Sequence, residues 1–200
     1  LTAQIEDASF VPVYYMGSED ADLDELGHIY TNGQKYEWKT KQTGAVGRMK
    51  VDDALITMLQ EVSGQIAVLP YGNSLVEMMK ECYVVGSSIE QATFKLVNKL
   101  FAVYGLLVLL PDNALVKAAF SNVMEKELLE GFSQPAVEAT MAAFPSKYKV
   151  QASGREINLF YLKDNIRERI EWNNDRYTVV NTDYSFTKAE MISELKTHPE

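Results

Sequence analysis

Cysteine, histidine and long apolar runs are all scarce in this chain of 200 residues. Its single cysteine, Cys82, excludes an internal disulfide and is expected to pack on the apolar face of a helix in a reducing cytoplasm. The two histidines, His28 and His198, are far apart, and no Cys or His spacing indicates a structural zinc site. The longest apolar run, Leu106–Leu110, is far too short to span a bilayer. These absences argue against a membrane protein and against a zinc-stabilised fold.

Positive charge is also in short supply, since 19 Lys and Arg face 28 Asp and Glu and leave a formal charge of −9. Nucleic-acid binding needs a basic surface that neutralises phosphates, so this balance argues against a nucleic-acid partner. Gly44-Ala45-Val46-Gly47 has the Gly-x-x-Gly form of an RNA-clamping loop, but two helices do not flank it and we interpret it as a turn. No glycine-rich phosphate-binding motif is present, so any nucleotide site must use another device.

The sharpest functional signal is a strand-like run that leads into a cluster of acids. Phe10–Met16 combine β-branched and aromatic residues, which predicts a strand buried on both faces, as in a parallel sheet. Five acids then occupy the seven positions from Glu19 to Glu25. Ligands of open α/β sheets bind beyond the carboxyl ends of the strands. The pattern therefore makes these acids candidates for binding or catalysis.

The acids suggest two kinds of metal site, a calcium-binding loop and the site of a metal-dependent hydrolase. Asp20, Asp22 and Asp24 resemble the start of a calcium-binding loop, but its sixth and twelfth positions require Gly and Glu, and here they are Glu25 and Thr31. The calcium loop is therefore rejected. A metal-dependent hydrolase remains an alternative, and it predicts a divalent ion at Asp20 and Asp22.

A structural interpretation explains the same acids as a helix start. Ser18 would cap the helix, and Glu19 and Asp20 would lie in its first turn, where the helix dipole favours anions. Asp20 and Asp24 would then repel each other at i,i+4 and slightly destabilise the helix. Capping alone does not need both acids, so this repulsion argues against a purely structural explanation. The alternative function is a non-catalytic structural or interaction module of a larger protein.

Turn and cap signals predict the elements that follow. Asn32-Gly33 lies between two β-prone runs and predicts a hairpin. Helices are expected after Asp52 or Asp53, after Asn73, and after Ser88, which opens a Ser-x-x-Gln capping box. The order of these signals predicts a hairpin and then three helices.

A second buried strand is expected near the middle of the chain. Gly105 ends the preceding helix, and the apolar run 106–110, followed by Pro111 and Asp112, then predicts a strand. Helix, glycine, strand and helix in this order are typical of a βαβ unit, so we expect this strand to run parallel to Phe10–Met16. Helices are expected over 113–130 and from Pro135 to about Pro145.

The last quarter of the chain changes to a period of two, which predicts an antiparallel meander. Its three expected strands are Ile157–Leu162, Arg167–Trp172 and Tyr177–Val180. A second capping box at Thr187 opens a final helix. The arginines of this region, Arg155, Arg167 and Arg169, are able to hold an anion, and charges that protect an edge strand are the alternative explanation.

The ordered motifs resemble the bacillithiol biosynthesis cysteine-adding enzymes. In that family a strand ends in Ser-Glu-Asp-His-Asp, and Val11–Asp22 are similar except that Ala21 replaces the histidine. The other matching segments, in the family's order, are Glu25 and His28, Tyr104–Leu106, Leu159–Leu162, Arg167–Ile170 and Phe186–Glu190. The family's Thr-Gly-Gln-Gln segment and its Arg-rich segment are absent. We therefore expect the chain, which lacks an initiator Met, to be the central fragment of a protein more than twice as long, without a complete site.

The resemblance implies a core similar to the nucleotide-binding fold of class I aminoacyl-tRNA synthetases. It further implies a cytoplasmic ligase that joins cysteine to glucosaminyl malate, and a coiled coil that makes the full-length protein a homodimer. The cofactor stays open, with an adenine nucleotide (ATP or ADP) and Mg²⁺ as candidates. We expect no nucleic-acid or membrane partner.

On this basis we predict an α/β fold with a partial Rossmann-like parallel-sheet core, a helical connecting insertion and a small antiparallel β meander. Residues 1–50 belong to the core with its hairpin, 51–104 form the insertion, 105–145 continue the core, and 146–200 form the meander and last helix. The predicted catalytic residues are Glu19, Asp20 and Asp22. The predicted substrate-binding residues are Ser18, Asp112 and Arg167, and no metal ligands are assigned.

Overall fold

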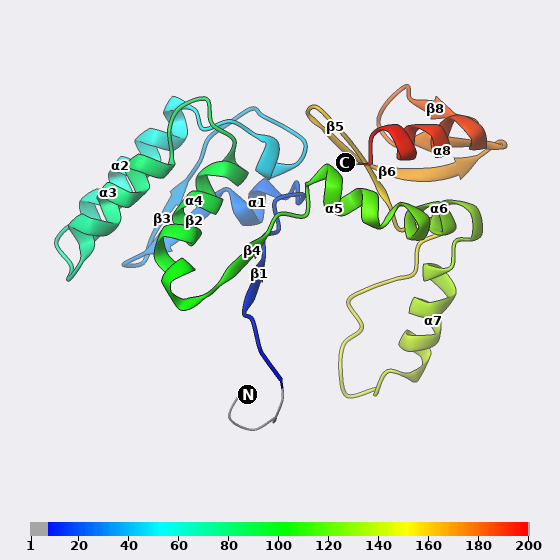
Figure 1. Cartoon of the computed structure of the whole chain (residues 1–200), viewed down its shortest axis with the longest axis horizontal. Helices are drawn as coiled ribbons and strands as arrows, with labels where there is room; N and C mark the ends of the chain where they lie inside the picture. The colour runs from blue at the N-terminus through cyan, green and yellow to red at the C-terminus, as the bar shows by residue number, and fades with distance from the viewer. Residues whose placement is uncertain (1–7, 200) are drawn as a thin grey trace. The chain divides into compact units, whose positions relative to one another are not determined.

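The computed structural model describes residues 8–199, and the chain divides into a first unit, Leu1–Pro111, and a second unit, Asp112–Glu200 (Figure 1). The predicted division into four segments is not tested by this and stays a prediction. Within the described residues no helix is long and apolar enough to cross a membrane.

The first unit combines short strands with a layer of helices. Its strands are β1 (Val13–Tyr15), β2 (His28–Thr31), β3 (Gln34–Glu37) and β4 (Leu107–Leu109). Its helices are α1 (Leu23–Leu26), α2 (Asp53–Ile66), α3 (Gly72–Cys82) and α4 (Ile89–Phe101), with 3-10 turns η1 (Val46–Arg48) and η2 (Ala102–Tyr104).

The two predicted buried strands do lie side by side and parallel. Tyr14 of β1 pairs with Val108 of β4, and the flanking pairs keep the same register. Parallel strands need a crossover connection, and here the hairpin and α2 to α4 supply it. Gly105 ends η2 in a left-handed conformation, φ 77°, and so turns the chain into β4. The predicted parallel pairing is therefore confirmed.

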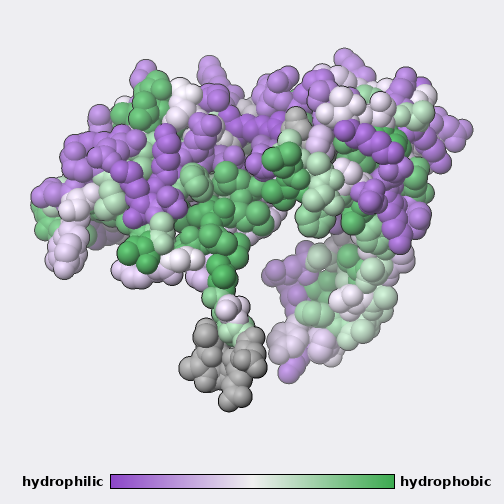
Figure 2. Space-filling model, in the orientation of Figure 1, coloured by the Kyte–Doolittle hydropathy of each residue, from purple (hydrophilic) through white to green (hydrophobic). Residues whose placement is uncertain are grey.

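The predicted burial of these strands on both faces is wrong for the described residues. Val13 is 57% exposed and Tyr15 60%, while Leu107 of β4 is 58% exposed. Among the described residues this sheet has two strands, and α4 packs against β4, where Val108 is half-buried. A parallel sheet normally has both faces covered, and here the other face is exposed. Figure 2 shows the resulting apolar surface along β1 and β4.

The core of the first unit lies instead between the β2–β3 hairpin, η1 and the helices. The hairpin turns at Asn32 and Gly33, which both have positive φ as a two-residue turn requires. Trp38 and Val51 are 7% and 1% exposed within this core. Its other buried members are Tyr36, Val46, Met49, Leu55, Met58, Val62 and Ala92. The predicted hairpin is confirmed, and its apolar face closes onto α2.

Two of the three predicted helix starts are confirmed. Asp52 caps α2 by accepting a hydrogen bond from the Leu55 N–H, and Ser88 caps α4. The third is wrong by two residues, because α3 begins at Gly72 after Tyr71 rather than after Asn73. The Leu75 N–H donates to the Tyr71 carbonyl and so starts the helix before Asn73. Position 72 requires glycine, because a Cβ there would collide with the backbone of the preceding helix.

The second unit places a four-stranded antiparallel sheet beside helices. Its helices are α5 (Ala114–Ala119), α6 (Ser121–Glu130), α7 (Ser133–Ala143) and α8 (Lys188–Thr197). Its strands, in the sheet order β5-β6-β7-β8, are β5 (Phe160–Lys163), β6 (Ile166–Asn173), β7 (Arg176–Val179) and β8 (Ser185–Phe186). The meander is confirmed, with a fourth strand too short to give a sequence period.

The predicted helix over 113–130 is in fact two helices. Phe120 has φ −98° and ψ 2°, outside the helical region, and separates α5 from α6. Gly131 ends α6 in the left-handed conformation, as predicted. The capping box at Thr187 is formed with Glu190 and opens α8.

The sheet of the second unit is covered on its inner face by α6 and α8. Tyr177 and Val179 are each 1% exposed, and the Tyr177 hydroxyl donates a hydrogen bond of 2.6 Å to the Leu128 carbonyl. Met191 of α8 completes the cluster at 3% exposure. This unit therefore closes a core of its own.

Candidate functional site

The end of β1 is fixed to the rest of the first unit through Ser18. The Met16 N–H donates to the Leu109 carbonyl and extends the β1–β4 ladder by one bond. Ser18 is 6% exposed, and its hydroxyl donates a 2.6 Å hydrogen bond to Oε2 of Glu90. Ser18 therefore does not cap a helix, and the structural interpretation is wrong on that residue.

The backbone of the acid segment is held by the turn at η1. The Gly47 N–H donates to the Ser18 carbonyl and the Val46 N–H donates to the Asp20 carbonyl, each at 2.7 Å. A Cβ on Gly47 would collide with Ser18, so this contact requires glycine. The Gly-x-x-Gly segment is thus a structural support for the acid segment, and Ala45 to Gly47 are buried.

Two of the acids organise the chain locally. Oδ1 of Asp20 accepts hydrogen bonds from the N–H groups of Ala21 and Asp22. Oδ1 of Asp22 accepts from the N–H groups of Asp24 and Glu25, and caps the four-residue helix α1. An acid does cap a helix here, but the cap is Asp22 and not the predicted Ser18, so the helix begins four residues later than predicted. Asp20 and Asp22 are both exposed, and Glu19 is half-buried.

The acids keep chemical capacity beyond these bonds. The hydrogen bonds of Asp20 and Asp22 engage one oxygen of each carboxylate, Oδ1. A carboxylate accepts on both oxygens, so the second oxygen can still bind a cationic ligand. Among residues 8–199 no group of three or more His, Cys, Asp or Glu is arranged to hold a metal ion. The second carboxylate oxygens of Asp20 and Asp22 are therefore able to accept hydrogen bonds from a ligand ammonium group.

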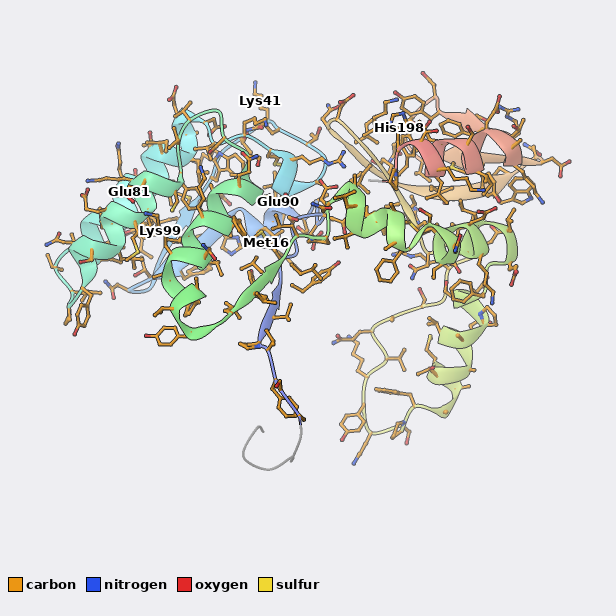
Figure 3. The ribbon with its side chains drawn as sticks, viewed as in Figure 1. Met16, Lys41, Glu81, Glu90, Lys99 and His198 are labelled. Carbon is orange, nitrogen blue, oxygen red and sulfur yellow. The ribbon has the colours of Figure 1, made fainter. Side chains whose placement is uncertain are left out.

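Glu90 is a candidate that the sequence reasoning missed. It lies in the first turn of α4, 72 residues from Ser18, and Figure 3 shows it close to the end of β1 near Met16. It lies between Ser88 and Gln91 of the predicted capping box, in the first turn of the helix, where the dipole favours an acid. Nothing in the sequence indicated which strand the helix start would meet.

Asp112 and Arg167 belong to the second unit and have separate surroundings there. Oδ1 of Asp112 lies 3.4 Å from Nζ of Lys117, and both side chains are largely buried. The Arg167 guanidinium lies over the Phe160 ring, 4.0 Å from its centroid. The predicted residues in one continuous segment are therefore Ser18, Glu19, Asp20 and Asp22.

Cys82 has no catalytic surroundings. Its side chain is fully buried on α3, and burial raises the pKa of the thiol. A thiol that is buried and kept protonated is a poor nucleophile. The predicted packing role of Cys82 is confirmed.

Comparison with known proteins identifies one family over the whole chain. Residues 1–200 match the family model described as "Bacillithiol biosynthesis BshC, N-terminal Rossmann-like domain". A protein of Cytophaga hutchinsonii named "Putative cysteine ligase BshC" is 41% identical over 198 residues, which are 97% of this chain and 35% of that protein.

Two further relatives carry the same name. The protein of Flavobacterium johnsoniae is 38% identical over 192 residues, covering 96% of this chain and 36% of the relative. The protein of Bacillus pumilus is 26% identical over 203 residues, covering 95% and 37%. The chain thus spans little more than a third of the length of these relatives.

Proposed function

The chain belongs to the bacillithiol biosynthesis BshC family and has its Rossmann-like α/β fold, and from this premise we propose that it forms one side of the substrate site of a cysteine ligase. The proposed reaction joins the cysteine carboxyl to the amine of glucosaminyl malate as an amide: the new carbon–nitrogen bond replaces a carbon–oxygen bond of the carboxyl group, and that oxygen leaves as water or, if ATP is consumed, on the phosphate that activated it. The chain by itself is proposed to be inactive, because it spans about a third of the relatives' length. The intact protein is proposed to be a cytoplasmic homodimer.

One observation carries this proposal. The acid segment begins where β1 ends, beside the parallel strand β4, and both strands point their carboxyl ends the same way. Ligands of α/β folds bind at this edge of the sheet. The hydrogen bonds from Gly47 and Val46 hold the segment in place, so its carboxylates are positioned before a ligand arrives.

The proposed roles follow from charge. Glu19, Asp20 and Asp22 hold the protonated amine of a substrate, and a carboxylate there can accept the amine's proton before the new bond forms. The Ser18 hydroxyl donates to Glu90, so its oxygen remains an acceptor for the same ammonium group. Glu90 acts through Ser18 as a positioning residue.

The cofactor proposal has a physical limit. Carboxylates repel the phosphates of ATP or ADP, so this segment fits a nucleotide only through a bridging Mg²⁺. Asp112 and Arg167 stay predicted substrate-binding residues, and both have local partners in the second unit. Any nucleotide is therefore proposed to contact mainly other parts of the intact protein.

The test is cysteine addition to glucosaminyl malate by the intact protein, with and without ATP. Asp20→Asn and Asp22→Asn keep the Oδ1 acceptor and remove the charge, so the local fold is preserved. We expect each to lower kcat/KM by about 10- to 100-fold, as loss of a charged hydrogen bond does. Asp24→Asn is the matched control, because Asp24 is an exposed acid of the same segment. It should change kcat/KM by less than about threefold, since exposed charges interact only weakly with other groups.

The second candidate function is a structural module, favoured by the capping bonds of Asp22. Under this reading an asparagine caps equally well, so Asp22→Asn would leave activity unchanged. Full activity of both Asp20→Asn and Asp22→Asn would therefore reject the substrate role and support the module.

A further inference from the structure

The outer face of the β5–β6 ribbon carries an unusual group of residues. Residues directly opposite in antiparallel strands share a face, and alternate residues along a strand share it too. The registered pairs of this face are Phe160 with Arg169 and Leu162 with Arg167. Tyr161 and Ile170 point to the other face, into the core. Two arginines and a phenyl ring therefore project together away from the core.

A third arginine joins this face from the preceding segment. The guanidinium carbon of Arg155 lies 5.9 Å from the centroid of the Phe160 ring, and that of Arg167 lies 4.0 Å from it. A ring attracts one cation, but two cations on one ring repel each other. The arrangement therefore gains from an anion that lies between or beside the two guanidinium groups.

Apart from the Phe160 ring, the two guanidinium groups have no hydrogen-bonding or ionic partner among residues 8–199. Within residues 8–199, Nε of Arg167 is buried and has no hydrogen-bond acceptor, and neither Arg155 nor Arg167 lies within 4.0 Å of a carboxylate. Two other arginines of this sheet differ. Arg176 donates to Ser185 and lies 3.5 Å from Glu190, and Arg169 lies 3.9 Å from Glu171.

The unpaired arginines are unexpected in this chain. Acids outnumber basic residues 28 to 19, so carboxylate partners are plentiful. Protection of an edge strand does not account for Arg167, because β6 lies between β5 and β7 in the sheet order. An anion that accepts from the terminal N–H groups of the two arginines accounts for both their position on one ring and the absence of carboxylates beside them.

We propose that Arg155 and Arg167, anchored on Phe160, form a binding site for a small anion that presents carboxylate or phosphate oxygens. A guanidinium donates two parallel N–H groups to either of these anions. Nε of Arg167 is sealed from solvent, so its terminal N–H groups are the ones available to the ligand. Contact with the Phe160 ring at 4.0 Å limits the motion of the Arg167 guanidinium and so reduces the entropy lost on binding. The acid segment takes no part in this site, and Arg167, which is also a predicted substrate-binding residue, is the one residue that it shares with the proposed function.

The test is calorimetric titration of the intact protein with inorganic phosphate and, separately, with succinate at low ionic strength. We expect saturable binding of at least one of them. Arg155→Gln with Arg167→Gln should weaken it at least about tenfold, since two charged hydrogen-bond donors are lost. Arg167→Lys should also weaken binding, because lysine keeps the charge but lacks the planar fork. Arg176→Gln is the matched control, since that arginine already has protein partners, and it should leave binding unchanged.

Each outcome of the titrations either supports or overturns the anion site. Tighter binding of phosphate than of succinate assigns a phosphate ligand, and the reverse assigns a carboxylate ligand. Absence of saturable binding of both anions, at concentrations up to about 10 mM, overturns the site, as does wild-type affinity in the double variant. If the Arg167 substitutions prevent folding, Arg155→Gln alone provides the test, because Arg155 is exposed and its replacement does not disturb the core. Cysteine addition assayed in the same samples separates failure of this site from failure of the acid segment.

Discussion

The two sheets of this protein differ in how completely they are covered. In the second unit, β5 to β8 pack one face onto α6 and α8, and Tyr177 and Val179 are each 1% exposed. In the first unit, β1 and β4 form a parallel pair whose side chains stay largely exposed.

The difference has a functional meaning. Parallel sheets in known folds are covered on both faces, whereas an antiparallel meander can leave one face in water. The second unit therefore covers one face of its own sheet, whereas most side chains of the β1–β4 pair stay exposed among the described residues. The acid segment lies at the end of this exposed pair of strands.

The largest expected effect is on the closed core of the second unit. Tyr177→Ala should lower the free energy of unfolding by about 3–5 kcal/mol, because it leaves a large cavity. Tyr177→Phe keeps the ring but leaves the Leu128 carbonyl unpaired, and should cost about 1–2 kcal/mol. Urea unfolding followed by Trp172, whose ring centroid lies 4.7 Å from that of Tyr177, measures both. A loss below about 1 kcal/mol for Tyr177→Ala would contradict the closed core.

A smaller effect is expected in the helical core of the first unit, where Asp52 caps α2. Asp52→Ala should cost about 1–2 kcal/mol, because it also removes the 2.8 Å hydrogen bond from the Trp38 indole. Trp38 fluorescence during urea unfolding reports this change. Asp52→Asn keeps a capping oxygen and should cost less than Asp52→Ala.

The same residue gives the first unit a pH dependence. Burial works to raise the pKa of the Asp52 carboxyl, but hydrogen bonds from Leu55, Trp38, Thr40 and Gln42 outweigh it and hold the pKa below its ordinary value of 3.8. A lowered folded-state pKa stabilises the fold fully above the unfolded value, and this contribution is lost as pH falls through the folded value. Unfolding midpoints of wild type should therefore fall below about pH 4. Asp52→Asn should show a flatter acid limb, and an unchanged limb would reject this assignment.

The smallest effect is expected on the exposed sheet. Val13→Thr and Leu107→Thr change register partners that are 57% and 58% exposed, so each should alter the stability of the 200-residue chain by less than about 0.5 kcal/mol. In the intact protein, where we expect further layers over this sheet, the same substitutions should cost about 1 kcal/mol or more. Equal effects in the chain and in the intact protein would remove the contrast between the two sheets.

Local signals predicted much of the fold correctly. The correct predictions rest on turn and cap signals that act within a few residues, so the local sequence is enough to predict them. These signals are Asn32-Gly33, the caps at Asp52, Ser88 and Thr187, and Gly105. The errors arose where distant contacts decide. Gly72, the first residue of α3, lies against the backbone at the end of α2, a contact that the local sequence does not show, and no Gly or Pro marks the break at Phe120.

The candidate site shows the same limit. The sequence identified the acids, because their density after a strand is visible along the chain. It could not identify Glu90, whose bond to Ser18 spans 72 residues, nor show that one oxygen each of Asp20 and Asp22 is engaged by backbone N–H groups. It also could not distinguish Arg155 and Arg167, which share the Phe160 ring, from Arg176, which has partners.

The sequence by itself determined the family, the parallel pairing of two strands and the position of the acid segment, because these depend on residue order and local periodicity. The tertiary structure alone decided which side chains are covered and which polar groups meet. Burial and pairing depend on surfaces contributed by segments far apart in the chain, and a strand with an apolar sequence is buried only when other elements supply the cover. For β1 and β4 that cover is not supplied by the described residues, and for β5 to β8 it is supplied by α6 and α8.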